Sequence, residues 1–418
     1  MSSLTNLFPL FVLLCVFALI IVRRLGPLRL AIWQIMLGGA AVVVAAGVIP
    51  PGRALSAINA DVMFFLFGMF VVGVALVESG YLQHISFDIF KRAKSTDGLV
   101  LLILFVMGAF SAILMNDTLA IIGTPLVLYF ADRHRVEPKL LLLALCFAIT
   151  TGSVMSPIGN PQNLLIAIGG RVENPFVTFA WYLAIPTVIN LFLTYLVLKI
   201  FYRKAFHETP LVSLREDVTD WHLARLARAS LVIVCCLIAI KAAAAFLYAG
   251  FDFKLTYIAV AAAAPILIFS PKRLVILRTV DWHTLIFFAA LFVLMEGVWA
   301  GGAVQSAMDS AGRGVTSTEF ILGAGVIVSQ ALSNVPFVAF YLPALVKADA
   351  PVSAMMALAA GSTIAGNLFI LGAASNVIVI QNAERRGATL SFMEFARVGA
   401  IVTVISVIVY WAFFRLIS

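Results

Sequence analysis

Long apolar stretches separated by short polar loops recur along the whole chain. Ten segments are long enough, at roughly 18 residues, for a helical crossing of a bilayer. Two further segments differ, because each consists of two shorter apolar arms around a polar centre. The pattern therefore predicts an all-α, polytopic membrane protein. The ten expected crossings lie near 7–22, 30–48, 61–80, 140–170, 176–200, 228–248, 253–270, 281–300, 353–383 and 396–415.

Segments 98–131 and 318–346 are predicted to be re-entrant helical hairpins. Each arm holds about 14–16 residues and would reach about 24 Å, which is short of a hydrocarbon core about 30 Å thick. Non-helical backbone at that depth is tolerated only where protein or a wet cavity covers it. Both hairpins are therefore expected to enter and leave the membrane on one side.

Composition and charge also indicate insertion in a bilayer. The 418 residues are 63% hydrophobic and 11% charged, whereas soluble chains carry roughly 25% charged residues. Of the 28 Lys and Arg residues, 21 fall in one set of alternate loops and six in the other, and Lys241 lies inside a span. Because cytoplasmic loops are enriched in positive charge, we expect a protein of the cell (inner) membrane with both termini outside. The net charge of +8 then reflects topology and not nucleic-acid binding.

The two halves of the chain match at fixed offsets, which predicts an internal duplication. Each half holds five crossings and one hairpin, so the second half starts on the opposite side and the repeat is inverted. The first repeat is expected at 1–200, with hairpin 98–131 and broken helix 140–170. A cytoplasmic linker at 201–227 precedes the second repeat at 228–418, with hairpin 318–346 and broken helix 353–383. The matched pairs are Pro51 and Asp61 with Pro271 and Asp281, Asn116 and Pro125 with Asn334 and Pro343, and Asn163 and Phe179 with Asn376 and Phe392.

Four polar clusters interrupt the apolar segments, two at hairpin tips and two inside the helices that follow. Proline removes a backbone donor and glycine weakens a helix, so the clusters predict breaks that leave amides and carbonyls unpaired. Free carbonyls suit cations and helix N-termini suit anions. Isolated small residues serve helix packing, but four symmetry-related clusters favour a substrate site. Its expected residues are Asn116, Asp117, Thr118, Ser153, Ser156, Asn160, Asn163, Ser333, Asn334, Asn367, Ser375 and Asn376.

Asp117 is the one acid expected near the membrane midplane. A charged side chain there costs at least about 2.5–3.5 kcal/mol on insertion scales, so its presence indicates a role. We expect Asp117 to carry protons. Capping of the second hairpin arm is the structural alternative, and both roles can coexist. The chain has no spacing typical of a metal site and no nucleotide-binding P-loop, so no cofactor is expected.

These clusters resemble the ion transporter superfamily over residues 50–415. The run MNDTLAIIGTPLVL is most similar to the arsenite/antimonite efflux (ArsB) family. The runs SPIGNPQNLL and GAASNVIVI resemble unwound loops across the superfamily, which includes NhaD-type antiporters and divalent-anion/sodium symporters. The resemblance implies a homodimer in which a part carrying both hairpins moves like an elevator against a scaffold, and it permits a cytoplasmic ATPase partner. The positions that match the group's binding region are Asn116, Asp117, Ser153, Asn160, Asn163, Asn334, Asn367 and Asn376.

The expected core has one acid and no Arg or Lys, which bears on the substrate. A dicarboxylate would prefer fixed positive charge or bound cations, whereas neutral arsenous acid can donate hydrogen bonds to Asp and Asn. Export of arsenite or antimonite by proton antiport is therefore the first hypothesis. A sodium/proton antiporter or a sodium-coupled anion symporter is the alternative, because Asp117 and free carbonyls also suit Na⁺. An enzyme would need a nucleophile–base pair or paired carboxylates at depth, and a membrane receptor or anchor would not need symmetrical helix breaks.

Overall fold

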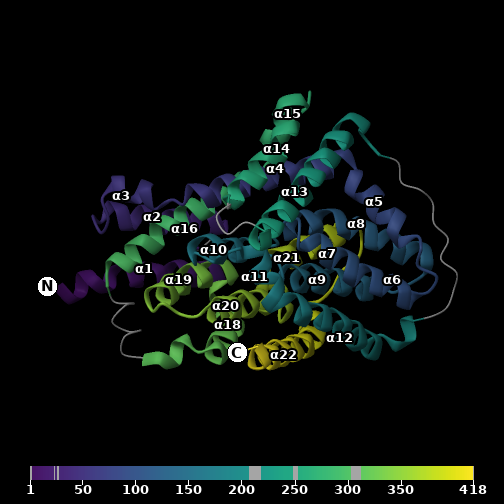
Figure 1. The fold of residues 1–418 in the computed structure, drawn as a ribbon. Coiled ribbons are helices and arrows are strands. Elements are labelled where there is room, and N and C mark those ends of the chain that lie inside the picture. The colour runs from purple at the N-terminus through teal and green to yellow at the C-terminus, as the bar shows by residue number, and fades with distance from the viewer. Residues whose placement is uncertain are drawn as a thin grey trace.

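The computed structural model describes residues 2–22, 24–25, 28–206, 218–247, 253–302 and 312–417. Nearly all regular secondary structure in these residues is helical. This confirms the all-α fold class predicted from the apolar pattern. The exception among the described residues is a two-residue ladder, in which β1 (Arg24–Leu25) pairs antiparallel with β2 (Leu28–Arg29). Figure 1 shows α14 and α15 at the top of the view, α22 at the bottom, and the short helices α10, α20 and α21 between them.

The first half begins with long and short helices and continues through a helical hairpin into a broken helix. Its elements are α1 (Ser2–Val22), α2 (Ile32–Ala45), α3 (Pro51–Ala57), α4 (Ala60–Ser79), α5 (Tyr81–Phe90), α6 (Thr96–Leu102), η1 (Ile103–Met107), α7 (Gly108–Ser111), α8 (Asn116–His134), α9 (Pro138–Ser153), α10 (Pro161–Gly169), α11 (Pro175–Phe179), η2 (Ala180–Ala184), α12 (Ile185–Phe201) and η3 (Arg203–Ala205).

The second half has a similar order of long helices, hairpin and broken helix. Its described elements are α13 (Trp221–Leu247), α14 (Leu255–Phe269), α15 (Arg273–Thr279), α16 (Trp282–Ala300), η4 (Gly312–Thr316), α18 (Thr318–Leu332), α19 (Asn334–Lys347), α20 (Val352–Ile364), η5 (Ala365–Asn367), η6 (Ile370–Gly372), α21 (Ala374–Glu384) and α22 (Phe392–Ile417). The inverted relation of the two halves in the membrane stays a prediction.

Both expected hairpins consist of two helical arms around a tight turn. In segment 98–131 the chain runs from α6 to α7, turns at 112–115 and continues as α8. In segment 318–346, α18 ends at Leu332 and α19 begins at Asn334. Ser333 between them has a φ of 67°, a left-handed conformation that is uncommon for a residue with a Cβ. This sharp turn puts the first amides of α19 at the tip.

The expected linker 201–227 was too long at its C-terminal end, because α13 already begins at Trp221. Asp220 starts the helix: its carboxylate accepts a hydrogen bond of 3.0 Å from the Leu223 amide and forms an ion pair of 2.7 Å with Lys272. The amide and the ammonium hold the pKa of Asp220 below its ordinary range. A polar N-cap within a charged segment thus moved the helix start seven residues earlier than hydropathy alone indicated.

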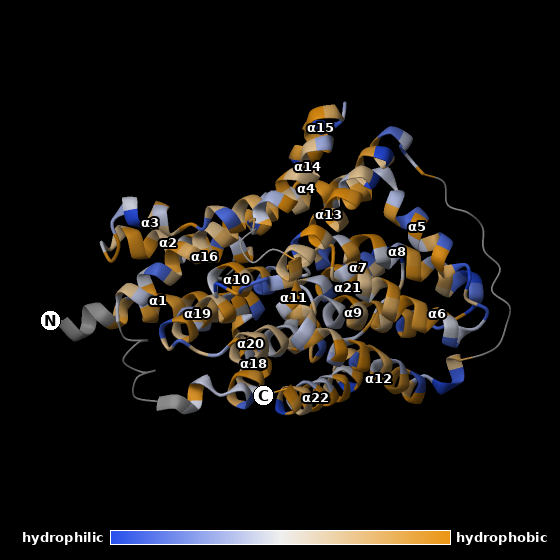
Figure 2. Ribbon diagram, in the orientation of Figure 1, coloured by the Kyte–Doolittle hydropathy of each residue, from blue (hydrophilic) through white to orange (hydrophobic). Residues whose placement is uncertain are grey.

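Five helical segments are long and apolar enough to cross a membrane by length and composition. They are Ala60–Ser79, Pro175–Phe201, Trp221–Leu247, Trp282–Ala300 and Phe392–Ile417. The other expected crossings are shorter apolar helices or pairs of half-helices. In Figure 2 hydrophobic residues follow the helices, while hydrophilic residues gather at helix ends and loops. Exposed Phe246 and Leu247 at the end of α13 are 77% and 72% accessible, as expected of lipid-facing side chains.

The ion pairs between different segments fall into two sets, which lie in two groups of helices. We call α1–α4 with α13–α16 the scaffold group, and α6–α12 with α18–α22 the hairpin group. Among the described residues, six ion pairs join different segments, and each stays inside one group. In the scaffold group these pairs are Arg53–Glu296, Lys254–Asp61 and Lys272–Asp220, and in the hairpin group they are Lys139–Glu394, Lys199–Asp97 and Arg415–Glu319.

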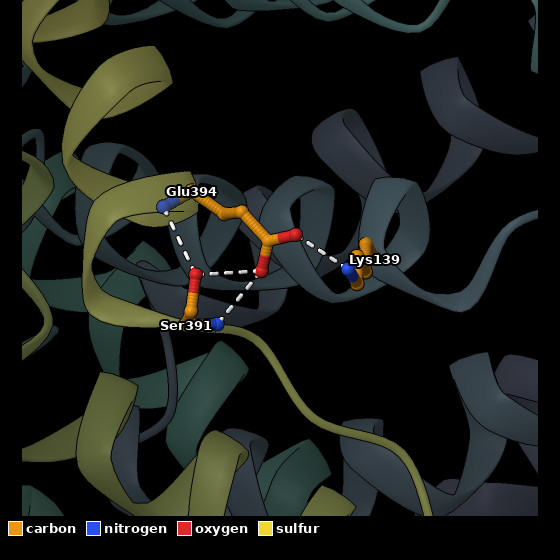
Figure 3. A network of polar contacts seen from close by, with 3 residues as sticks. All are labelled: Lys139, Ser391 and Glu394. Atoms are coloured by element: carbon orange, nitrogen blue, oxygen red, sulfur yellow. Dashed lines mark hydrogen bonds and ion pairs between the residues drawn. The ribbon is translucent and has the colours of Figure 1, made fainter.

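The Lys139–Glu394 pair illustrates how the hairpin group is held together (Figure 3). Glu394, in the first turn of α22, also accepts hydrogen bonds from the amide and the hydroxyl of Ser391 at 2.9 and 2.8 Å. The Ser391 hydroxyl in turn lies 3.3 Å from the Glu394 amide, which completes a capping box. Because Lys139 lies at the start of α9, its ion pair with Glu394 joins the capped start of α22 to α9.

Candidate functional site

The N-terminal ends of four helices meet at one cavity of about 340 Å³. These helices are α8 and α19, which begin at the hairpin tips, and α10 and α21, which begin after the two helix breaks. The starts of α2 and α16 form the facing wall. The lining residues are Ile32, Trp33, Asn116, Asp117, Asn160, Pro161, Gln162, Asp281, His283, Thr284, Phe287, Phe288, Ser333, Asn334, Val335, Ala373, Ala374 and Ser375.

The first break is stabilised by two asparagines. The side-chain amide of Asn163 donates to the carbonyls of Ser153, Val154 and Ser156 at 3.1, 3.2 and 2.9 Å. These carbonyls lost their helical partners where α9 ends. Asn160 accepts a hydrogen bond of 2.8 Å from the Asn163 amide and so caps α10. The break is therefore a fixed, hydrogen-bonded structure.

The tip of the first hairpin is joined to this break. Asn116 donates from Nδ2 to Oγ of Ser153 at 3.3 Å, and its Oδ1 lies 2.7 Å from the Ser111 hydroxyl. The Ser111 hydroxyl is also 2.6 Å from the Ile149 carbonyl. The tip of α8 thus rests on the end of α9, and Asp117, one residue further along, lines the cavity.

The two halves of the chain meet directly at the breaks. Thr363, near the end of α20, accepts hydrogen bonds from Asn160 and Gln162 at 3.3 and 3.2 Å, and its hydroxyl lies 3.4 Å from Oδ1 of Asn163. On the other side, Asn367 donates to the Thr151 hydroxyl at 3.0 Å. The broken segments of the two halves therefore form one polar layer inside the hairpin group.

Three of the four helix N-termini at the cavity have no side-chain cap. The residues before α8, α19 and α21 are Met115, Ser333 and Ala373, and none of them accepts a capping hydrogen bond. Their first backbone amides point toward the helix start, where the helix dipole also concentrates positive charge. Such ends bind anions. The cavity therefore offers a positive field from backbone groups although no Lys or Arg lines it.

The structure brings half of the predicted site residues to the cavity wall. Asn116, Asp117, Asn160, Ser333, Asn334 and Ser375 line it. Ser153, Ser156, Asn163, Asn367 and Asn376 are buried in the polar layer behind the wall. Thr118 instead packs against α4, since a Cβ at Gly73 would lie 2.4 Å from its hydroxyl.

Sequence reasoning missed the wall formed by α2 and α16. Asp281, which entered the repeat comparison only as a match for Asp61, lines the cavity opposite the hairpin tips. Its carboxylate caps α16 by accepting from the Thr284 amide at 3.0 Å. His283 stacks on Trp33 with ring centroids 5.2 Å apart. The sequence signal for this wall is weak, because Trp33 and His283 are 250 residues apart.

Comparison with known proteins agrees with a membrane carrier. The family model described as "Citrate transporter" matches residues 17–350. An uncharacterized transporter of Mycobacterium tuberculosis, Rv2684, is 29% identical over 366 residues, 84% of each chain. The P protein of Homo sapiens is 23% identical and matches 89% of this chain and 55% of its own. The crystal structure of the Alcanivorax borkumensis YdaH transporter has the same fold, with a TM-score of 0.62 at 14% identity over 99% of this chain and 98% of that one.

Proposed function

Since the chain belongs to the citrate transporter family of the ion transporter superfamily, and is thus a multi-pass membrane transporter and not an enzyme, we propose that it carries a small carboxylate anion together with a coupling proton. Citrate, named in the family description, is the first cargo to test. The proposed cargo site is the cavity between the hairpin tips and the start of α16.

One observation carries this proposal: uncapped N-termini of α8, α19 and α21 meet at a single cavity of about 340 Å³. Several helix N-termini aimed at one point favour carboxylate groups in a site that lacks basic side chains. The side-chain amides of Asn116 and Asn334 add neutral donors at the same wall. This field replaces the fixed positive charge that a dicarboxylate or tricarboxylate would otherwise require.

Asp117 and Asp281 supply the coupling in this proposal. Both line the cavity, so in their ionised forms they repel an anionic cargo. Protonation of Asp117 removes one negative charge beside the cargo, and anion and proton then bind together. This favours symport of the anion with a proton, whereas the sequence led us to expect antiport of arsenite and protons.

An elevator-like movement of the hairpin group is the proposed form of alternating access. Its support is that the six ion pairs between different described segments each stay inside one group. A second cavity of about 460 Å³ lies further along the same boundary, between Phe292 and Met295 of α16 and Leu165, Ala339 and Leu342 of the hairpin group. A homodimer, a cytoplasmic linker, and termini on the outside of an inner membrane complete the proposed arrangement.

The first cavity has lining residues close in sequence to the loops that carry most positive charge. Its wall includes Ile32, shortly after Arg29, and Asp281, shortly after Arg278. The second cavity includes Asn59 and Lys347, next to sparsely charged loops. With basic loops in the cytoplasm, this conformation presents the cargo site to the cytoplasm.

Export of arsenite or antimonite by proton antiport is the second candidate. The observation that favours it is a lining with two carboxylates, Asp117 and Asp281, and no Lys or Arg. Arsenous acid is neutral and donates hydrogen bonds to such groups. A sodium/proton antiporter would use the same carboxylates without a second solute, and a sodium-coupled anion symporter would replace the proton by Na⁺.

Transport by the purified protein in liposomes tests the proposal. We expect labelled citrate to accumulate above its external concentration when the external solution is made more acidic than the lumen, and labelled arsenite to remain at the level of empty liposomes. Arsenite accumulation driven by the opposite gradient, with no citrate flux, would select the second candidate. Flux of neither solute under either gradient contradicts both.

A further inference from the structure

His283 lies in the first turn of α16, in the wall of the cargo cavity opposite the hairpin tips. Its imidazole stacks on the indole of Trp33, with ring centroids 5.2 Å apart and ring planes inclined by 21°. Within the described residues, neither nitrogen of this imidazole takes part in a hydrogen bond or an ion pair, and the residue is exposed. The stack therefore holds the ring at the cavity wall and leaves its nitrogen atoms available to a ligand.

The stack of His283 on Trp33 is not needed to pack α2 against α16. A cluster of apolar side chains already joins these two helices, and it includes the fully buried Met36, Leu291 and Leu294. The two stacked rings lie outside this cluster, at the starts of both helices, where they line the cavity. A ring pair that served packing alone would be expected inside the cluster, so its position at the cavity points to a ligand.

Two carboxylates share the cavity with His283. Asp281, two residues earlier, caps α16 by accepting hydrogen bonds from the amide and the hydroxyl of Thr284 at 3.0 and 2.5 Å. Asp117 lies in the opposite wall, at the start of α8. No Lys or Arg is among the lining residues. Within the described part of the chain, a protonated His283 is therefore the one cationic side chain at this cavity.

The helices packed around the start of α16 add no basic group to the cavity. The sequences of α1 and α2 contain no charged residue. α4 contacts Trp282 through Phe67, with ring centroids 5.9 Å apart, and has no charged residue between Val62 and Val77. The basic residues of α3, α15 and α19 do not line the cavity; they are Arg53, Arg273, Arg278 and Lys347.

A protonated imidazole at this wall suits a carboxylate. Histidine is the side chain that ordinarily changes charge between about pH 5 and pH 8, and its charged form donates from both nitrogens. Hydrogen bonds between such a cation and a carboxylate are short and strong. The indole face of Trp33 also attracts a cation that stacks on it. An anion between the two walls thus meets helix N-termini on one side and an imidazolium on the other.

We infer that His283 is a cargo-binding residue of the scaffold wall, which binds a carboxylate of the cargo in its protonated form. The inference rests on the proposed function and names a residue that determines its specificity. His283 belongs to the scaffold group, whereas the helix N-termini belong to the hairpin group, so an elevator-like movement separates them. His283 therefore strengthens binding in this conformation alone. It carries no proton across the membrane, which stays the role proposed for Asp117.

The fluorescence emission of Trp33 reports on this interaction without transport. In the detergent-purified full chain we expect it to fall as the pH is lowered from about 8 to about 5, because a protonated imidazole quenches an indole that it contacts. The Trp33 signal is the part of the emission that Trp33→Phe removes. Citrate should raise the midpoint pH of this fall by about one unit for a tenfold preference for the protonated form.

Substitutions of His283 separate its charge from its packing. His283→Gln should weaken citrate binding, measured by equilibrium dialysis, roughly tenfold near pH 5.5 and less near pH 8. His283→Arg keeps a cation at both pH values and should bind citrate more tightly than the parent protein does near pH 8. His84→Gln is the matched control and should change neither result. His84 also contacts a tryptophan ring, that of Trp221 at 6.2 Å, but it does not line the cavity.

Either of two results would overturn the inference: a midpoint of the Trp33 signal that saturating citrate does not move, or equal citrate affinities of His283→Gln and the parent protein at acidic pH. Accumulation of citrate in liposomes together with either result would reject the role of His283 and leave the proposed function standing. A midpoint that citrate raises, without citrate transport, would reject the proposed function and leave carboxylate binding at His283 standing.

Discussion

Replacing Asp117 with asparagine is expected to abolish the response of transport to a pH gradient. The substitution keeps the size of the side chain and its capacity to accept hydrogen bonds at the start of α8, but removes the proton that the acid can bind. A gradient of about one pH unit supports about tenfold accumulation for each coupled proton. Liposomes with the variant should therefore show citrate exchange without accumulation, which is measured as the ratio of internal to external label.

Asp132→Asn is the matched control for this experiment. Asp132 lies on the same helix, α8, near its other end and exposed to solvent. It should leave accumulation unchanged. If Asp117→Asn accumulates citrate as well as the parent protein does, Asp117 is a helix cap and the coupling proton binds elsewhere.

Replacing Asn163 with aspartate is expected to destabilise the protein by several kcal/mol. The change keeps the volume but removes the donor that serves three carbonyls, those of Ser153, Val154 and Ser156. The carbonyls of Val154 and Ser156 would lose this donor at a cost of about 1–3 kcal/mol each, whereas the Ser153 carbonyl keeps hydrogen bonds from the Ser156 amide and from Asn160. A carboxylate at this place would also repel all three. Thermal unfolding in detergent should show a large drop of the midpoint or no folded protein.

Asn382→Asp, on the partly exposed part of α21, provides the comparison and should unfold close to the parent protein. An Asn163→Asp midpoint within a degree or two of the parent midpoint would show that the break does not depend on this side chain. The conclusion that hydrogen bonds from Asn163 fix the first break would then be wrong.

The breaks in the helices could be predicted from the sequence because their causes are local. Pro161 and the glycines near it weaken a continuous helix, and Asn160 directly before Pro161 supplies an N-cap for a new one. Proline alone is not sufficient, since Pro125 and Pro343 lie inside α8 and α19. Asn116, Asp117 and Asn160 stand at or next to the starts of the helices that follow, so their place at the cavity follows from local structure. Thr118 was wrongly predicted to lie at the cavity. Successive side chains on a helix point about 100° apart, so Thr118, next to Asp117, faces Gly73 of α4 and not the cavity.

The facing wall of the cavity could not be predicted, because it depends on packing between distant segments. Asp281 and His283 look like ordinary residues at a helix start until α16 is placed against the hairpin tips. The choice of cargo changed for the same reason. The sequence shows a site with one acid and no basic side chain, which favours a neutral cargo. The positive field of several uncapped helix N-termini could be recognised only from the structure, where these helix ends meet at one cavity.

Protection of an introduced cysteine by citrate tests most directly whether the helix N-termini bind the cargo. In a variant without the four native cysteines, Ala374→Cys places a thiol in the first turn of α21 at the cargo cavity, and Ala339→Cys places one at the second cavity. We predict that citrate slows alkylation of the first thiol in a concentration-dependent manner and leaves the second unchanged. Equal alkylation rates with and without citrate at Ala374→Cys, in protein that still transports citrate, would contradict the account.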